Sequence, residues 1–85
     1  MAKVSGKALA KLRQRFGARL RDVREKRELT QPDVSKQSGI DQASISLYEA
    51  GEKEPRLSRV FRLAAALSVD AGALFEEPGT SINGR

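Results

Sequence analysis

The sequence predicts an all-α protein, a compact domain built from five helices. Three observations support this prediction. The chain has 85 residues, which is the size of one small domain. Its apolar residues recur every three or four positions, as on one face of a helix, and no useful stretch alternates as a strand would. Helix-capping residues and glycines separate these apolar stretches from one another.

The first helix is predicted from an apolar stripe near the N-terminus. The stripe consists of Leu9, Leu12, Phe16, Leu20 and Val23. Ser5 is a candidate for the N-cap of this helix. Gly17 lies inside the stripe, so the helix either breaks there or begins at Phe16. We therefore expect residues 1–15 to form a basic, helical N-terminal extension and residues 16–76 to form the main domain.

Two short helices follow in the middle of the chain. Thr30 is the expected N-cap of the second helix, which has Pro32 in its first turn and ends at Gly39. Asp41 is the expected N-cap of the third helix, which spans residues 42–50. Two helices joined by a short turn that contains glycine form the helix-turn-helix pattern.

A charged loop at residues 52–55 precedes a fourth helix with an apolar face. This face consists of Leu57, Val60, Phe61, Leu63, Ala64 and Leu67. A weak fifth turn of helix follows, capped by Asp70 and containing Leu74 and Phe75. Residues 77–85 are rich in turn-forming residues, so we expect them to form a flexible tail.

The residue types that are absent limit the possible chemistry. The chain has no Cys and no His, which removes disulfides, zinc fingers, thiol nucleophiles and the usual general base. No spacing pairs a nucleophile with a base. We therefore expect no enzymatic activity, no metal, no cofactor and no small-molecule ligand. No apolar run approaches the ~20 residues of a membrane span and no signal peptide begins the chain, so we expect a cytoplasmic, nucleoid-associated protein that does not enter membranes.

Positive charge is concentrated at one end of the chain. Residues 1–27 contain ten Lys or Arg and two acidic residues, a balance of +8, whereas residues 28–85 have a balance of −3. Such a distribution suggests a polyanionic partner, nucleic acid first and an anionic membrane surface second. A solvated helix face explains the earliest basic residues equally well. These residues are Lys3, Lys7, Lys11, Arg13 and Arg15.

The helix-turn-helix pattern at residues 30–51 separates a core face from an outward face. The predicted core side chains are Val34, Ile40, Ile45 and Tyr48. The predicted outward side chains are Gln42, Ala43, Ser44, Ser46 and Leu47. Small and amide side chains on a short exposed helix suit entry into a DNA groove, where Gln can form two hydrogen bonds with adenine.

Four segments carry a family resemblance. They are Phe16–Arg24, Leu29–Gln31, Ser38–Ile40 and Ser44–Gly51. At these spacings they resemble the phage-repressor family of helix-turn-helix proteins, the Cro and XRE type, over roughly residues 16–76. The resemblance implies a lambda-repressor-like fold. It also implies a sequence-specific regulator of transcription, expected to be a repressor, that binds an inverted-repeat operator in double-stranded DNA as a homodimer.

The resemblance also assigns roles to individual residues. The third helix is the recognition helix, and its base-reading positions are Gln42, Ala43, Ser44, Ser46 and Leu47. The positions that contact the DNA backbone are Gln31, Lys53 and Arg56. Arg24 and Glu49 match a pair that ties the first helix to the recognition helix. In two departures, Arg56 replaces the usual Ser or Thr cap of the fourth helix, and Glu52 stands where a basic residue is common.

Three alternative functions stay open. The first is an antitoxin or a restriction-modification controller, which is still a DNA-binding autoregulator. The second is a protein–protein adaptor that uses the same fold without reading bases. The third is a membrane-surface role for residues 1–27, with the apolar stripe facing lipid. For the expected homodimer, the leftover apolar residues Leu9, Leu12, Leu74 and Phe75 mark the contact surface.

Overall fold

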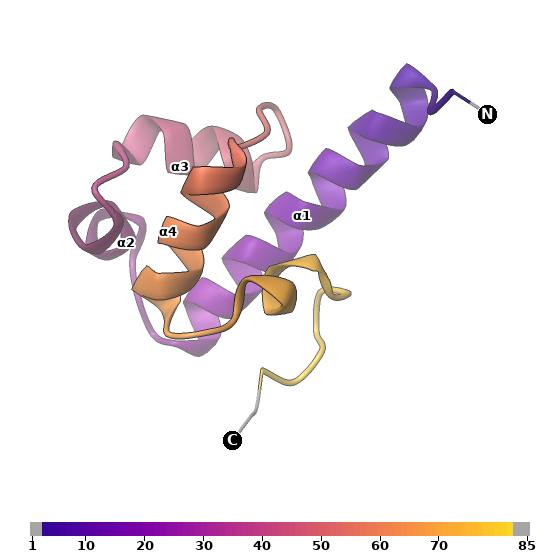
Figure 1. Cartoon of the computed structure of the whole chain (residues 1–85). Helices are drawn as coiled ribbons and strands as arrows, with labels where there is room; N and C mark the ends of the chain where they lie inside the picture. The colour runs from indigo at the N-terminus through magenta and orange to yellow at the C-terminus, as the bar shows by residue number, and fades with distance from the viewer. Residues whose placement is uncertain (1–2, 83–85) are drawn as a thin grey trace.

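A computed structural model describes residues 3–82 as four α-helices and one 3₁₀ helix, with no strand among those residues (Figure 1). The elements are α1 (Gly6–Lys26), α2 (Gln31–Ser38), α3 (Gln42–Glu49), α4 (Leu57–Leu67) and η1 (Ala71–Phe75). The predicted all-α class is therefore confirmed, but the fifth predicted helix is a 3₁₀ turn. Asp70 stands at its N-cap position and makes no capping hydrogen bond, so the expected cap is absent.

The first helix, α1, runs without interruption through Gly17. Neither predicted alternative, a break at Gly17 or a start at Phe16, is found, because Ser5 caps the helix by accepting a hydrogen bond from the N–H of Ala8 at 3.0 Å. Gly17 serves close packing instead. A Cβ at this position would collide with the backbone carbonyl oxygens of Tyr48 and Glu49, the latter at 2.7 Å. The glycine thus lets α1 approach the end of α3.

The two short helices begin and end through local signals. Thr30 and Asp33 form a capping box at the start of α2, in which each side chain accepts a hydrogen bond from the other residue's backbone N–H. Gly39 ends α2 with a φ of 74°, a left-handed conformation that glycine adopts without steric cost. Asp41 caps α3 by accepting a hydrogen bond from the N–H of Ser44 at 2.9 Å. The caps predicted for these two helices, Thr30, Gly39 and Asp41, are therefore confirmed.

The core lies where the helices meet, and its buried side chains come from every element. They are Leu20, Val23, Val34, Ile40, Ile45, Tyr48, Val60, Leu63, Ala64, Ala66, Leu67 and Leu74. The four core positions predicted for the helix-turn-helix segment are all buried. The predicted apolar face of α4 differs in part, because Leu57 and Phe61 are 71% and 58% exposed. They lie one turn apart at the edge of the face, beyond the width that the core covers.

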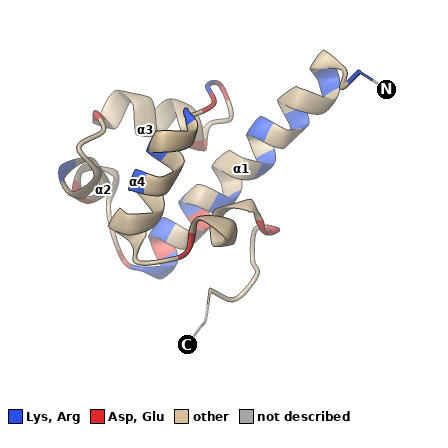
Figure 2. Cartoon of the chain, viewed as in Figure 1, with Lys and Arg blue, Asp and Glu red and all other residues tan. Residues whose placement is uncertain are grey.

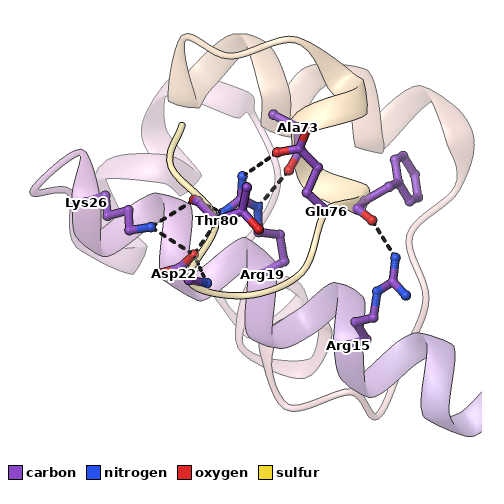
Figure 3. A network of polar contacts seen from close by, with 9 residues as sticks. Arg15, Arg19, Asp22, Lys26, Ala73, Glu76 and Thr80 are labelled. Atoms are coloured by element: carbon purple, nitrogen blue, oxygen red, sulfur yellow. Dashed lines mark hydrogen bonds and ion pairs between the residues drawn. The ribbon is translucent and has the colours of Figure 1, made fainter. Parts of the chain in front are cut away.

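The segment after η1 lies against α1 and differs from the predicted flexible tail. Arg19 of α1 is fully buried, and its guanidinium donates hydrogen bonds to the carbonyl oxygens of Ala73 at 2.7 Å and Thr80 at 2.6 Å (Figure 3). The same group pairs with Asp22 at 2.9 Å and with Glu76 at 3.1 Å. Residues 76–82, which we call the C-terminal strap, are therefore held by an interior cation. Residues 83–85 of the predicted tail lie outside the described residues.

Two further bonds extend this attachment at either side of Arg19. Lys26 donates a hydrogen bond to the carbonyl oxygen of Thr80 at 2.9 Å, and Arg15 donates one to that of Phe75 at 2.7 Å (Figure 3). Ile82 packs partly buried against the core. The strap is thus fixed by polar bonds along α1 and by an apolar contact near its end.

Candidate nucleic-acid interface

The helix α3 has one face in the core and one face in solvent. Ile45 and Tyr48 are buried on the inner face, and the Tyr48 hydroxyl accepts a hydrogen bond from Arg59 of α4 at 2.8 Å. The exposed side chains form a contiguous surface that we call the α3 outer face. It consists of Gln42, Ala43, Ser46 and Leu47. Their spacing of one, three and four residues places them on one side of the helix.

Ser44 does not belong to this outer face, although the sequence places it among the base-reading residues. It is only 7% exposed. Its hydroxyl donates a hydrogen bond to Oδ1 of Asp41 at 2.9 Å, while its backbone N–H donates to Oδ2. Both polar groups of Ser44 are therefore used in capping α3. Because this cap orients Ser44 toward Asp41, the side chain faces the start of its own helix rather than outward.

The predicted pair of Arg24 and Glu49 joins α1 to α3. Nε of Arg24 donates to one Glu49 carboxylate oxygen at 2.7 Å and its second guanidinium nitrogen donates to the other at 3.0 Å. The side chains are 12% and 6% exposed. The hydrogen bonds to Glu49 outweigh the effect of burial and raise the pKa of Arg24. A two-pronged pair of this kind fixes the orientation of α3 as well as its position.

Gln31, predicted to touch the DNA backbone, lies half-buried at the start of α2. Its side-chain NH₂ donates a hydrogen bond to Oε1 of Glu49 at 3.0 Å. A glutamine amide has two N–H donors, so this bond leaves the second N–H for another acceptor. Through Glu49, the first turn of α2 is thus connected both to α3 and to Arg24 of α1.

The other two predicted backbone contacts lie beyond α3. Lys53 is exposed in the loop after α3, and Arg56 is exposed at the N-cap position of α4, where it makes no capping hydrogen bond. The same loop carries the exposed acidic residues Glu52 and Glu54, and Glu54 pairs with Arg13 at 3.6 Å. The structure therefore brings together cations and carboxylates in this loop, whereas basic residues recur along α1 (Figure 2).

A cation that the sequence analysis missed stands beside the helix-turn-helix turn. The guanidinium of Arg62 lies so close to Gly39 that a Cβ there would come within 2.9 Å of it. Arg62 is exposed on α4. In the sequence, Arg62 lies outside the predicted apolar face of α4. That position indicates a surface cation next to the segment that flanks the helix.

Other kinds of site receive no support from the described part of the chain. Between residues 3 and 82, no three His, Cys, Asp or Glu residues gather in a way that could hold a metal ion. Within the same range, no helix has both the length and the apolar character needed to cross a membrane. The α3 outer face and the groups that hold it remain the candidate site.

Comparisons with known proteins agree with this geometry. A family model described as a helix-turn-helix domain matches residues 15–77. The cryptic phage CTXphi transcriptional repressor RstR of Vibrio cholerae is 31% identical over 68 residues, which is 80% of this chain and 61% of that protein. The chain thus matches about three-fifths of the length of this relative.

A solved structure is also similar. The restriction-modification controller protein C.AhdI from Aeromonas hydrophila superposes with a TM-score of 0.73 at 32% sequence identity. The match covers 74% of this chain and 96% of that chain. Nearly the whole controller protein therefore aligns with about three-quarters of this chain.

Proposed function

The chain belongs to the helix-turn-helix domain family, and from this premise we propose that it is a sequence-specific, double-stranded DNA-binding repressor of transcription. The observation that carries the proposal is the two-sided fixation of α3. Its inner face is buried through Ile45 and Tyr48 and its end is held by Arg24, while its outer face presents small and amide side chains to solvent. A helix held in this way can enter the major groove without losing its orientation.

We assign the contacts with the DNA bases to the four residues of the α3 outer face. Gln42, in the first turn, can form two hydrogen bonds with adenine, and Ser46 can bond to several bases. Ala43 and Leu47 can contact a thymine methyl group. Leu47 is 39% exposed, a position in which an apolar side chain gains by leaving water. Ser44 instead supports this surface by capping the helix.

We assign the contacts with the DNA backbone to three residues, Gln31, Lys53 and Arg56. Gln31 would use its second N–H toward a phosphate oxygen while the first holds Glu49. Lys53 and Arg56 would neutralise phosphates on the other side of α3. Neutralised phosphates release counterions, so we expect affinity to fall steeply with salt, with a slope corresponding to about four to eight phosphate contacts.

We further propose that residues 16–76 form the DNA-binding unit, that two copies bind an inverted repeat, and that the protein acts in the cytoplasm on the nucleoid. One recognition helix reads only a few base pairs, and a single module buries about 600–1,000 Å² against DNA. A two-fold pair doubles both the readout and the phosphate contacts. The half-site centres would then lie about 10–10.5 base pairs apart.

A second candidate function is control of its own operon, as in a restriction-modification controller. The similarity to C.AhdI, which extends over 96% of that chain, favours it. The two functions share one DNA-binding mechanism and differ in the target. The DNA upstream of the protein's own gene distinguishes them, because an autoregulator binds there with its highest affinity.

The decisive experiment is selection of random double-stranded DNA by the purified protein, followed by two variants. Gln42→Ala should cost about 1–3 kcal/mol at one base pair and relax the preference there. Arg56→Ala should lower affinity for all sequences alike and reduce the salt slope by about one. If the protein shows no preference among sequences at moderate salt, it is an adaptor and the proposal is wrong.

A further inference from the structure

The first part of α1 extends beyond the helical body. In Figure 1 the N-terminal half of α1 projects away from α2, α3 and α4. We call residues 3–14 the N-terminal arm, which consists of the first turns of α1 and the residues just before it. The arm precedes residues 15–77, which the helix-turn-helix family model matches. It is therefore an addition to the domain that the family describes, and the proposed function gives it no role.

The charges of the arm are all positive. Its charged residues are Lys3, Lys7, Lys11 and Arg13, and the first acidic residue of the chain is Asp22. Lys7 and Lys11 are exposed and, being four residues apart, lie on the same side of α1. The arm in Figure 2 carries blue segments and no red one. Among residues 3–82, no hydrogen bond or ion pair involves the side chains of these three lysines.

The carboxylates near the arm do not pair with its lysines. Glu54 pairs with Arg13 at 3.6 Å, and Glu77 pairs with Arg15 at 3.2 Å. Each of these carboxylates therefore already has an arginine of α1 as its partner. Glu52 is exposed in the loop after α3 and forms no ion pair with the arm. The arm thus keeps a surplus of positive charge, which predicts a polyanionic partner.

The arm lies next to the proposed DNA contacts. Gln14, its last residue, packs so closely against the loop after α3 that a Cβ on Gly51 would come within 2.8 Å of the Cα of Gln14. Lys53, to which we assign a phosphate contact, lines the same apolar hollow as Leu9 and Leu12 of the arm. The loop that follows the recognition helix therefore adjoins the arm. A duplex bound by α3 and Lys53 would have the arm at its side.

The length of the arm suits contact with several phosphates. Residues 6–14 of α1 extend for about 13 Å at 1.5 Å per residue, which equals about four base pairs at 3.4 Å each. Lys7 and Lys11 lie about 6 Å apart along the helix axis, so each can approach a different phosphate. Lysine is a flexible point charge that attracts phosphate without reading bases.

We propose that the N-terminal arm binds the phosphate backbone of the DNA that flanks the bases read by α3, through Lys7 and Lys11. Lys3, just before α1, extends this contact. The inference rests on the proposed function, because it adds a sequence-independent contact to the same DNA complex. The contact lengthens the duplex that one copy covers by about four base pairs. DNA is favoured over an anionic membrane because the arm adjoins the loop that carries Lys53.

The main test measures the affinity of the full chain for a duplex with one selected half-site and flanks of about one helical turn, roughly ten base pairs. Fluorescence anisotropy over a range of salt concentrations gives the affinity and its salt slope. Lys7→Gln/Lys11→Gln should lower the affinity about tenfold at about 0.1 M salt and reduce the slope by about two, because two phosphate contacts are lost. The base preference should stay the same.

Single variants supply the matched control. Lys11→Gln should reduce the salt slope by about one. Lys36→Gln removes the same charge from an exposed residue of α2 and should leave the slope unchanged. Equal effects of Lys11→Gln and Lys36→Gln would mean that only the net charge matters, and the proposal would be wrong.

Trimming the duplex tests where the arm lies. Removal of the flanking base pairs should weaken the wild-type protein by about the factor that Lys7→Gln/Lys11→Gln loses on the long duplex. The same trimming should leave the affinity of this variant unchanged, because its arm no longer holds the flank. Losses that add together would place the two lysines elsewhere and overturn the proposal. Lys7→Glu/Lys11→Glu keeps the test valid if the glutamine variant loses helix by circular dichroism, since acidic residues stabilise the beginning of a helix.

DNA selection separates this inference from the proposed function. If the wild-type protein shows no base preference but its affinity for long duplexes depends on Lys7 and Lys11, the arm contact stands and the proposed function fails. If it selects a site and Lys7→Gln/Lys11→Gln binds long and trimmed duplexes as the wild type does, the proposed function stands and the inference is wrong. If that variant binds DNA normally but no longer binds vesicles of phosphatidylserine and phosphatidylcholine, the arm faces a membrane and the inference is equally wrong.

Discussion

Arg19 and Arg24 lie five residues apart on α1, and each guanidinium is bound on several sides, but they hold different regions of the molecule. Arg24 binds both carboxylate oxygens of Glu49 and the carbonyl oxygen of Leu29 at 2.9 Å, so it joins α1 to α3. Arg19 binds the carbonyl oxygens of Ala73 and Thr80, so it joins α1 to η1 and the C-terminal strap. One arginine serves the candidate site and the other serves the opposite end of the chain.

The two arginines differ in which partner groups would lose hydrogen bonds if the arginine were replaced. Without Arg24, the carboxylate of Glu49 is a nearly buried charge with the Gln31 amide as its remaining partner. Without Arg19, the carbonyl oxygen of Ala73 loses its donor, that of Thr80 keeps Lys26, and the more exposed carboxylates of Asp22 and Glu76 each lose a partner. The strap then loses its interior anchor. The first loss misorients the recognition helix, and the second uncovers the core near Leu74. Loss of Arg24 should therefore lower both DNA affinity and stability, whereas loss of Arg19 should lower stability alone.

The largest effect is expected for Arg19→Met, which keeps an apolar stem and removes the guanidinium. Because Arg19 is fully buried and holds both backbone and carboxylate partners, its loss should lower the free energy of unfolding by about 3–5 kcal/mol. Urea denaturation followed by circular dichroism measures this. DNA affinity per folded molecule should stay the same. A loss below about 1 kcal/mol would mean that the strap does not depend on Arg19.

The second prediction concerns the Arg24–Glu49 pair. Glu49→Gln strands the buried guanidinium and should destabilise the protein by about 2–3 kcal/mol, whereas the double variant with Arg24→Met should lose less than the two single variants together. A double-mutant cycle should give a coupling energy of about 1–3 kcal/mol. DNA affinity should fall in all three variants, in contrast to Arg19→Met. Zero coupling would show that the two side chains act independently.

The same comparison explains what could be predicted from the sequence. Caps are local, so Thr30, Asp41 and Gly39 were identifiable from their neighbours in the chain. The Arg24–Glu49 pair followed from the family resemblance. The role of Arg19 was not predicted, because its acceptors at Ala73 and Thr80 are 54 and 61 residues away and are backbone oxygens, which leave no mark in residue type. Its place beside Leu20 on the apolar stripe was the only signal.

One residue of the candidate site and one segment outside it differ from the prediction for a similar reason. Ser44 was placed on the outward face because a small polar residue usually lies outside, but its hydroxyl binds the cap residue Asp41. The turn-forming residues 77–85 predict a flexible tail, whereas Arg19 and Ile82 hold residues 76–82 in place. In both cases a specific polar partner overrides the preference of the residue type.

The third prediction uses pH to measure the strap network. Burial opposes ionisation of Asp22, but the N–H of Gly79, Arg19 and Lys26 outweigh it and lower the pKa of this carboxyl. Because the folded pKa lies below the unfolded value of about 3.9, the carboxylate stabilises the fold above that value. The stabilisation is lost as the pH falls through the folded pKa.

Asp22→Asn should therefore lose about 1 kcal/mol at pH 7, a value reduced by solvent screening of this partly exposed group. The difference from wild type should disappear as the pH falls well below 4. Denaturation curves from pH 7 down to acid measure it, with Asp70→Asn as a control because Asp70 makes no capping bond. A difference that persists unchanged in acid would mean that the Asp22 charge contributes nothing.

The smallest effect is expected for a third arginine of α1, Arg21, which pairs with Glu25 at 3.0 Å in the open, with side chains 64% and 56% exposed. This pair has the same residue types as Arg24–Glu49, but it lies within one helix and is joined by one hydrogen bond, so it is the exposed, local reference for the buried pair between α1 and α3. Water screens the exposed charges and both side chains lose rotamer freedom, so the cycle of Arg21→Gln and Glu25→Gln should give a coupling of about 0.3–0.5 kcal/mol. This small coupling should vanish in 1 M salt, where screening acts within about 3 Å, while the Arg24–Glu49 coupling persists. If the two couplings were equal in size and in salt dependence, burial would not be what makes Arg24 effective, and the orientation of the recognition helix would need another source.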